Sequence, residues 1–318
     1  MTPFAQLAPP LASIQAPAAI AMVRPHRFAP DAKGCPDNGF TSTPVGRPDD
    51  VARAAYLEVT AMAEAIADHG VRVHLFEDAS GATPDSVFPN NWFSTHDDGS
   101  LALYPMRAGT RRLERRPDIV AELIRSYLMP TVRDYARWEE VDQFLEGTGA
   151  MVLDHQARIA YVARSPRASE VVLRRFCADH GYRAVVFDAE DRHGEPIYHT
   201  NVMMAVGAEI AVVCLESMPL ERDRRRVRAE LEAAGRQVVP ITLTQVEDFA
   251  GNAIELTGRD GGMFVISARG WGSLRLPQRR AIESALDVLP VRVPTIEYAG
   301  GSARCMIAGL HAPARPTP

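Results

Sequence analysis

Hydrophobic and polar positions along the chain repeat with a spacing of about fifty residues. Each unit opens on small or polar residues, continues as a two-stranded hairpin and a helix with an apolar face, and ends in a short apolar strand. The openings lie near Asn91, Thr148, Asn201, Asn252 and Ser302. Such a repeat indicates one supersecondary unit used several times, so that neighbouring units bury a continuous core and five of them can close into a ring.

The same pattern predicts the positions of the single elements. Helices are expected over residues 49–69, 117–128, 169–180, 219–234 and 277–289, and the strands that follow them at 71–76, 135–138, 184–187, 238–241 and 291–294. Residues 305–308 read as a short buried strand, and the first strand, 19–23, closes the last unit.

One α/β domain over residues 18–312 is the expected organisation. Residues 1–17 are rich in Ala and Pro without a basic start or an unbroken apolar core, which predicts a loose tail rather than a signal peptide. Residues 313–318 form a second, Pro-rich tail. The Gly- and Pro-rich segment 28–48 reads as a loop over a surface or a site, and the sequence leaves open whether it is a lid.

Composition excludes several classes of function. A net charge of −5 and the lack of a basic stripe argue against nucleic acid, and no stretch reaches the roughly 18 apolar residues of a membrane span. Four scattered cysteines give neither a zinc spacing nor a disulfide framework, which favours a reducing cytoplasm. The histidines show no ligand spacing, so we expect no metal and no cofactor, and a small molecule as partner. The sequence leaves a homodimer open.

Cys305 is the first candidate for chemistry. It follows the paired glycines Gly300 and Gly301, which let other backbone approach closely. A small apolar residue in a core is the plain alternative. Two earlier openings, residues 146–149 and 198–201, carry Glu146 and His199 at corresponding repeat positions, which favours a shared site.

The order of Glu146, His199 and Cys305, together with Phe-Pro-Asn-Asn-Trp-Phe at 88–93 and Gly-Gly-Ser-Ala-Arg-Cys at 300–305, resembles the guanidino-group-modifying or pentein superfamily. Within it the chain is similar to the arginine-deiminase-related branch that includes bacterial citrulline hydrolases. The resemblance covers nearly the whole chain after about residue 18. It implies a five-fold pseudosymmetric α/β propeller of ββαβ modules.

Carried over by position, the resemblance implies that Cys305 is the nucleophile, that His199 is the general acid and base, and that Glu146 holds substrate –NH2 groups or orients His199. The chemistry is consistent with these roles. A thiolate attacks an electron-rich ureido or guanidinium carbon better than water does. A histidine can protonate the departing ammonia and then take a proton from the hydrolytic water.

Two departures from arginine deiminases bear on the substrate. Those enzymes have His-x-Asp where this chain has His199-Thr200-Asn201, and Phe-Thr-Arg-Asp where it has residues 93–96, Phe-Ser-Thr-His. The missing acids grip a cationic guanidinium, whereas the amide of Asn201 matches a neutral ureido group. Acids such as Asp85 or Glu255 would weaken this hypothesis if they pointed into the site.

The remaining candidates concern substrate binding. Asn90, Asn91 and Asn252 are expected to line the pocket, with turn formation as their alternative, and Arg24 and Arg107 are candidates for the substrate α-carboxylate. The first hypothesis is a hydrolase that converts citrulline to ornithine, ammonia and carbon dioxide. The alternatives are an arginine deiminase or related guanidine hydrolase, and a non-catalytic binding protein of the same fold.

Overall fold

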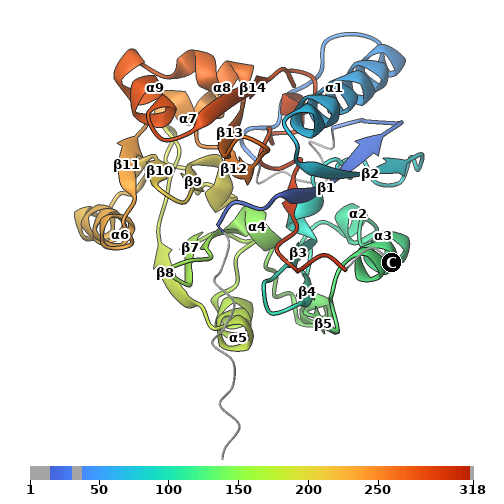
Figure 1. The fold of residues 1–318 in the computed structure, drawn as a ribbon, viewed down its shortest axis with the longest axis horizontal. Helices are drawn as coiled ribbons and strands as arrows, with labels where there is room; N and C mark the ends of the chain where they lie inside the picture. The colour runs from blue at the N-terminus through green and yellow to red at the C-terminus, as the bar shows by residue number, and fades with distance from the viewer. Residues whose placement is uncertain (1–14, 31–37, 316–318) are drawn as a thin grey trace, which may run out of the picture.

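Five three-stranded β-sheets surround a common axis, and most of the helices lie outside them (Figure 1). This computed structural model describes residues 15–30 and 38–315. In every sheet an inner strand is antiparallel to the middle strand, and the middle strand is parallel to the outer one. The predicted propeller of repeated ββαβ modules is confirmed, and no closed barrel forms.

The strands occupy equivalent places in the five sheets. The inner strands are β3 (Phe93–Thr95), β6 (Met151–Asp154), β9 (Met204–Val206), β12 (Ile254–Thr257) and β15 (Ala308–Gly309). The middle strands are β4 (Ser100–Leu103), β7 (Ile159–Ala163), β10 (Ile210–Val213), β13 (Gly262–Ser267) and β1 (Ala19–Pro25). The outer strands are β5 (Thr131–Asp134), β8 (Arg183–Phe187), β11 (Gln237–Pro240), β14 (Asp287–Val291) and β2 (Arg72–Asp78).

Helices connect each middle strand to its outer strand. They are α1 (Pro48–Asp68), α2 (Gly109–Arg112) with α3 (Pro117–Ser126), α5 (Glu170–His180), α6 (Glu221–Ala233), and α8 (Ala268–Ser273) with α9 (Leu276–Glu283). The shorter helices are α4 (Gly147–Ala150), α7 (Leu243–Glu247), and the 3₁₀ turns η1 (Pro89–Asn91), η2 (Ala136–Val141), η3 (Thr200–Val202), η4 (Leu215–Ser217) and η5 (Ile296–Tyr298).

Local sequence explains the clearest of these helices. The buried positions of α1, among them Val51, Val59 and Ile66, recur at helical spacing and face the sheet. Ser169 caps α5 by accepting a hydrogen bond from the Val171 backbone N–H, and Gly181 ends that helix at φ 69°.

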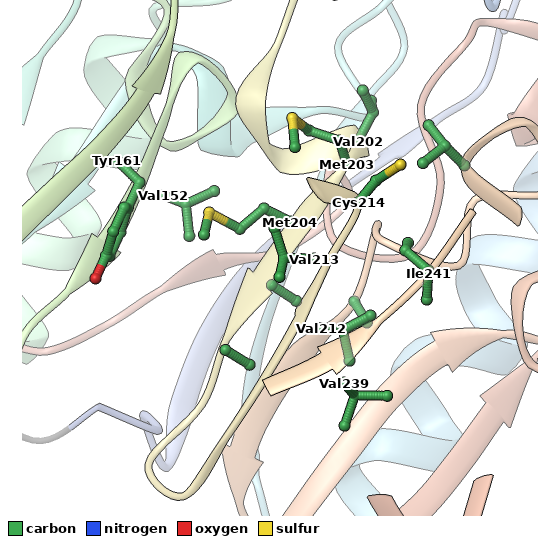
Figure 2. Packing of buried hydrophobic residues seen from close by; sticks show 14 of the residues in the cluster. Val152, Tyr161, Val202, Met203, Met204, Val212, Val213, Cys214, Val239 and Ile241 are labelled. Carbon is green, nitrogen blue, oxygen red and sulfur yellow. The ribbon is translucent and has the colours of Figure 1, made fainter. Parts of the chain in front are cut away.

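The chain closes on itself through its first strand. β1 pairs antiparallel with β15 and parallel with β2, so the start and the end of the chain belong to one module. A continuous apolar core joins neighbouring modules, as between β6, β9 and β10 (Figure 2). Each fully buried large aliphatic side chain in such a core contributes about 1.5–3 kcal/mol relative to exposure.

Three of the predicted elements are wrong in position. Residues 135–138 are not a strand, because β5 is the polar stretch Thr131–Asp134, which pairs in register with β4. The helix expected to reach residue 289 ends at Glu283, and Asp287–Val291 pairs with β13 as β14. Cys305 lies in a turn before β15 rather than inside a strand.

The ends of the domain also differ in detail from expectation. Residues 15–17 were assigned to the tail, but Gln15 donates hydrogen bonds to the carbonyls of Leu153 and Val206, and Ala16 is buried. The rest of that tail, residues 1–14, lies outside the described residues. Among the described ranges, none of the helices has the length and apolar run that crossing a bilayer requires.

Candidate functional site

The openings of the first three modules meet because two glycines in the second one allow it. Gly147 has φ +47°, and a Cβ there would lie 2.4 Å from the Asn90 carbonyl oxygen. A Cβ on Gly149 would lie 2.2 Å from Asn91 Nδ2 and 2.7 Å from His199 Nδ1. The Glu-Gly-Thr-Gly stretch therefore allows Asn91 and His199 to approach from the modules on either side.

Glu146 and His199 form a buried pair at this junction. His199 Nε2 lies 2.8 Å from Glu146 Oε2, and the two side chains are 2% and 0% exposed. Burial raises the pKa of Glu146, but Arg167, the hydrogen bond with His199 and Arg111 together lower it well below its usual range. Burial lowers the pKa of His199 to about 4, although Glu146 acts in the opposite direction. His199 is therefore neutral at pH 7.

The tautomer of His199 follows from its partner. An ionised carboxylate only accepts hydrogen bonds. His199 Nε2 therefore carries the ring proton and donates a hydrogen bond to Glu146. Nδ1, on the side of Gly149, then holds a lone pair. The second carboxylate oxygen of Glu146 accepts from the Arg107 backbone N–H at 3.0 Å. Nδ1 is therefore the nitrogen of His199 that is able to accept a proton.

Two buried arginines supply positive charge to the same region. Arg111 donates to both oxygens of Glu114, at 3.0 and 2.9 Å, and to Asn91 Oδ1 at 2.9 Å. Arg167 donates to Glu146 Oε2 at 3.3 Å. Burial raises the pKa of Glu114 to about 7, although Arg111 acts in the opposite direction.

Cys305 is 2% exposed, and two carboxamides contact its sulfur. Asn201 Nδ2 lies 3.3 Å from Sγ and Asn252 Nδ2 lies 3.2 Å from it. Asn252 Oδ1 accepts from the backbone N–H groups of Arg304, at 3.1 Å, and Cys305, at 3.4 Å. The third and fourth modules thus fix the position of the sulfur.

A narrow cavity, hereafter the candidate cavity, brings these groups together. Its charged and polar lining includes Asp85, Asn91, Arg111, Arg167 and His199 besides Cys305. Asn38, Phe88, Tyr198, Ala299 and Gly301 complete the wall. A thiol, a neutral imidazole held by a carboxylate, and two guanidinium groups therefore face one enclosed space.

The structure separates the predicted site residues into three groups. Cys305 and His199 line the candidate cavity, with Glu146 directly behind His199. Asn91 also lines it, whereas Asn201 and Asn252 contact the sulfur. Asn90 is fully buried beside them, without a hydrogen-bond partner for its amide among the described residues.

The two arginines proposed for the α-carboxylate lie elsewhere. Arg24 binds Glu77 and Thr60 near the outer edge of β1. The Arg107 side chain is exposed, and its backbone N–H binds Glu146. The sequence analysis missed Arg111, Arg167 and Glu114. The spacing of Arg111 and Glu114, three residues apart, was the only available signal, and it is equally typical of an exposed surface pair.

Asp85 and Glu255, the two acids named as a test of the neutral-substrate hypothesis, face different cavities. Asp85 lines the candidate cavity. Glu255 lines a second cavity of about 630 Å³, the axial cavity, which is surrounded by the five inner strands and also contains His155, Arg304 and His311. His96, the residue compared with a missing acid, follows β3 and stacks on His180 at 4.0 Å between ring centroids. In the described part of the chain, no group of three or more His, Cys, Asp or Glu side chains is placed to hold a metal ion.

Comparisons with known proteins give the context for this geometry. A family model described as eukaryotic N,N dimethylarginine dimethylhydrolase matches residues 24–312. The search of curated proteins found no match.

Several solved structures share the fold. The substrate-bound N-terminal domain of ArgZ, described as an arginine dihydrolase from the ornithine-ammonia cycle in cyanobacteria, is 15% identical with a TM-score of 0.71, over 91% of this chain and 96% of that one. Unliganded AgrE is 16% identical with a TM-score of 0.71, over 94% of this chain but 40% of AgrE. A dimethylarginine dimethylaminohydrolase carrying an S-methyl-L-thiocitrulline adduct is 18% identical with a TM-score of 0.60, over 91% and 98% of the two chains.

Proposed function

The chain belongs to the N,N-dimethylarginine dimethylhydrolase family, within the guanidino-group-modifying pentein superfamily, and from this premise we propose that it is a cysteine-dependent hydrolase of a C–N bond in a ureido or guanidino amino acid. The observation that carries the proposal is that Cys305 and the Glu146–His199 pair face one buried cavity. A protein that only binds a partner does not require a nucleophile and an oriented base at the same cavity.

The proposed substrate is citrulline. The Cys305 thiolate attacks the ureido carbon, and the bond to the terminal nitrogen breaks as that nitrogen takes a proton and leaves as ammonia. The carbon then joins sulfur and the side-chain nitrogen of ornithine as a thiocarbamate. Water adds to that carbon, the thiolate leaves, and the resulting carbamate loses carbon dioxide to give ornithine.

His199 would move the protons in both halves of this sequence. Its Nδ1 lone pair is the free base of the pair, and Glu146 stabilises the imidazolium that forms when Nδ1 takes a proton. The same nitrogen would relay a proton from solvent to the departing ammonia and then deprotonate the hydrolytic water. Glu146 would thus act through His199 and not on the substrate, because its oxygens already accept hydrogen bonds from His199, Arg167 and the Arg107 backbone.

Arg111 and Arg167 replace Arg24 and Arg107 as our candidates for the α-carboxylate. Both guanidinium groups are 3% exposed and line the candidate cavity. A carboxylate that enters a buried site needs a paired cation. Protonation of Glu114 near pH 7 would release Arg111 for that role.

The choice between citrulline and arginine depends on the neutral and acidic groups of the cavity. Asn91 Nδ2 is buried without a partner among the described residues, and it is a donor suited to a ureido oxygen. Asp85 favours the second candidate, arginine or a related guanidine, because a carboxylate stabilises a guanidinium. Arg111 offsets that carboxylate electrostatically, so we place citrulline first.

The test is to incubate the purified protein with citrulline and with arginine separately, and to measure ammonia, ornithine and citrulline. We expect ornithine and ammonia from citrulline, and no product with Cys305→Ala. Ammonia and citrulline from arginine would keep the catalytic residues and reverse the substrate assignment. If neither amino acid is consumed, the citrulline assignment is wrong, and another guanidine or urea, or a binding role, takes its place.

A further inference from the structure

The sulfur of Cys305 accepts hydrogen bonds from two carboxamides whose orientations are not equally free. Asn252 Oδ1 accepts from two backbone N–H groups, and its Nδ2 also donates to the Asn201 carbonyl oxygen at 3.0 Å. Backbone N–H groups only donate and carbonyl oxygens only accept, so both ends of the Asn252 amide are fixed by their partners. Its N–H group must therefore point at Sγ.

Two N–H donors on one sulfur favour its ionised form. A thiol is a weak acceptor, whereas a thiolate accepts strongly from several donors. Asn201 Nδ2 is the second donor, and Asn201 Oδ1 has no hydrogen-bond partner among the described residues, so the amide of this side chain is held by its contact with Sγ. Asn201 is fully buried, which makes an uncommitted amide costly unless it serves the sulfur or a ligand.

A partly buried cation, Arg304, directly precedes the nucleophile in the chain. Arg304 lines the axial cavity, and its guanidinium donates to the Ile307 carbonyl oxygen at 2.8 Å. No carboxylate lies within ion-pair distance of it among the described residues. Burial lowers the pKa of Arg304 to about 10, and the neighbouring Cys305 charge acts in the opposite direction.

The other ionisable groups around the sulfur do not provide this charge. Asp85, Arg111, Arg167 and His199 share the candidate cavity with Sγ. Both arginines are bound to Glu114 and Glu146, and His199 is neutral at pH 7. Burial thus disfavours a cysteine–imidazolium ion pair in the resting site.

We propose that Asn201 and Asn252, with the charge of the adjacent, partly buried Arg304, hold Cys305 as a thiolate before any substrate binds. This inference rests on the proposed function and deepens it. A guanidinium substrate can itself stabilise a thiolate, but a neutral ureido substrate brings no charge. A nucleophile ionised by fixed protein groups is thus the arrangement that a neutral substrate requires.

The experiment measures how the rate at which iodoacetamide alkylates Cys305 depends on pH, in the full chain without substrate. Cys305→Ala gives the background from the other cysteines. Burial raises the pKa of Cys177 to about 11 and that of Cys214 to about 12, so these two thiols contribute little near neutral pH. The ultraviolet absorbance of the thiolate provides a second readout.

We expect a wild-type alkylation midpoint at least about one pH unit below the value near 8.5 of a free cysteine. Asn201→Leu should raise the midpoint by about one pH unit, which is close to a tenfold loss of thiolate at lower pH. Asn201→Asp should raise the midpoint further, because it places a negatively charged carboxylate beside the sulfur. Asn90→Leu is the matched control, a buried asparagine of the first module with no contact to Sγ, and it should leave the midpoint unchanged.

A wild-type alkylation midpoint near 8.5 would overturn the proposal even if every variant failed to fold. Equal alkylation midpoints in Asn201→Leu and the wild type would also overturn it. Because alkylation requires no turnover, the outcome is independent of the substrate assay. Hydrolysis of citrulline by an enzyme with an ordinary midpoint would overturn this inference and leave the proposed function intact.

Discussion

The candidate cavity and the axial cavity share no lining residue, yet Cys305 lines one and its neighbour Arg304 lines the other. In the candidate cavity, buried charges are paired: Arg111 with Glu114, and Arg167 with Glu146. Around the axial cavity, His155 and His311 stack on each other, and burial lowers the pKa values of His155 and nearby His96 well below normal. The inner strands thus separate a region of paired charge from a region rich in histidine.

This difference indicates where reactivity is supported. Paired charges in a buried site hold protonation states fixed while a reaction proceeds, which is the property of an electrostatically preorganised site. Stacked histidines such as His155 and His311, whose ring centroids are 3.9 Å apart, instead fill space in the middle of a propeller. Four predictions test the contrast.

Removing the base of the candidate cavity should have the largest effect. We expect His199→Ala to lower kcat about 10²–10⁴-fold, because both proton transfers lose their carrier. The matched change in the axial cavity, His155→Ala, should leave kcat unchanged per folded molecule. Steady-state kinetics of both variants measure this contrast. Equal losses in the two would show that the cavities are not functionally distinct.

Arg111 and Arg304 should differ in their effect on stability. Arg111→Met leaves Glu114 without its cation, whereas Glu146 keeps Arg167, and should lower the free energy of unfolding by about 3–5 kcal/mol. Arg304→Met removes a cation that has no carboxylate partner among the described residues, so the loss should not exceed the about 1.5 kcal/mol of its hydrogen bond to Ile307. Urea unfolding at pH 7 compares the two, and a larger loss for Arg304→Met would contradict the assignment.

Stability should fall as the pH is lowered from about 6.5 toward 4. The pKa values of His180 and His199 are lowered to about 4, so in this window the unfolded chain binds protons that the folded chain excludes. Each such histidine contributes a slope of up to about 1.4 kcal/mol per pH unit, and the loss is absent above the unfolded pKa. Urea unfolding at pH 5 and 7 measures the slope.

A single variant assigns part of that slope to the histidine cluster. His180→Phe should reduce the slope, because one excluded proton is removed. An unchanged slope in His180→Phe would mean that His180 is already protonated in the folded protein.

The smallest expected effect concerns Glu114. Because its pKa is raised to about 7, this carboxyl competes for Arg111 above pH 7 and releases it below. KM for the substrate should therefore rise several-fold between pH 6 and 8, and Glu114→Gln should remove most of that rise. A KM that rises equally in both proteins would exclude Arg111 as the carboxylate ligand.

The sequence predicted the parts of the molecule that depend on local pattern. The spacing of Val51, Val59 and Ile66 defines the buried face of α1, and the recurring openings gave the five modules. The outer strands were harder, because β5 is polar and largely exposed. Its position is set by pairing with β4, which a local pattern does not encode.

The candidate site shows the same limit. Glu146, His199 and Cys305 could be proposed from their order in the repeats, but Arg111 lies in a stretch rich in arginine that reads as surface. Only its tertiary contacts with Asn91 and Glu114 bury it. The contacts of Asn201 and Asn252 with Sγ join residues 104 and 53 positions apart, so the sequence indicated the amides but not their target.

The central claim is that Cys305 forms a covalent bond with the carbon of a ureido or guanidino group. The most direct measurement is intact-protein mass spectrometry of acid-quenched enzyme during turnover, followed by peptide mapping. We predict an adduct on Cys305 with the mass of citrulline less ammonia, and none in Cys305→Ala. Turnover by Cys305→Ala, or an adduct on another cysteine, would contradict the account.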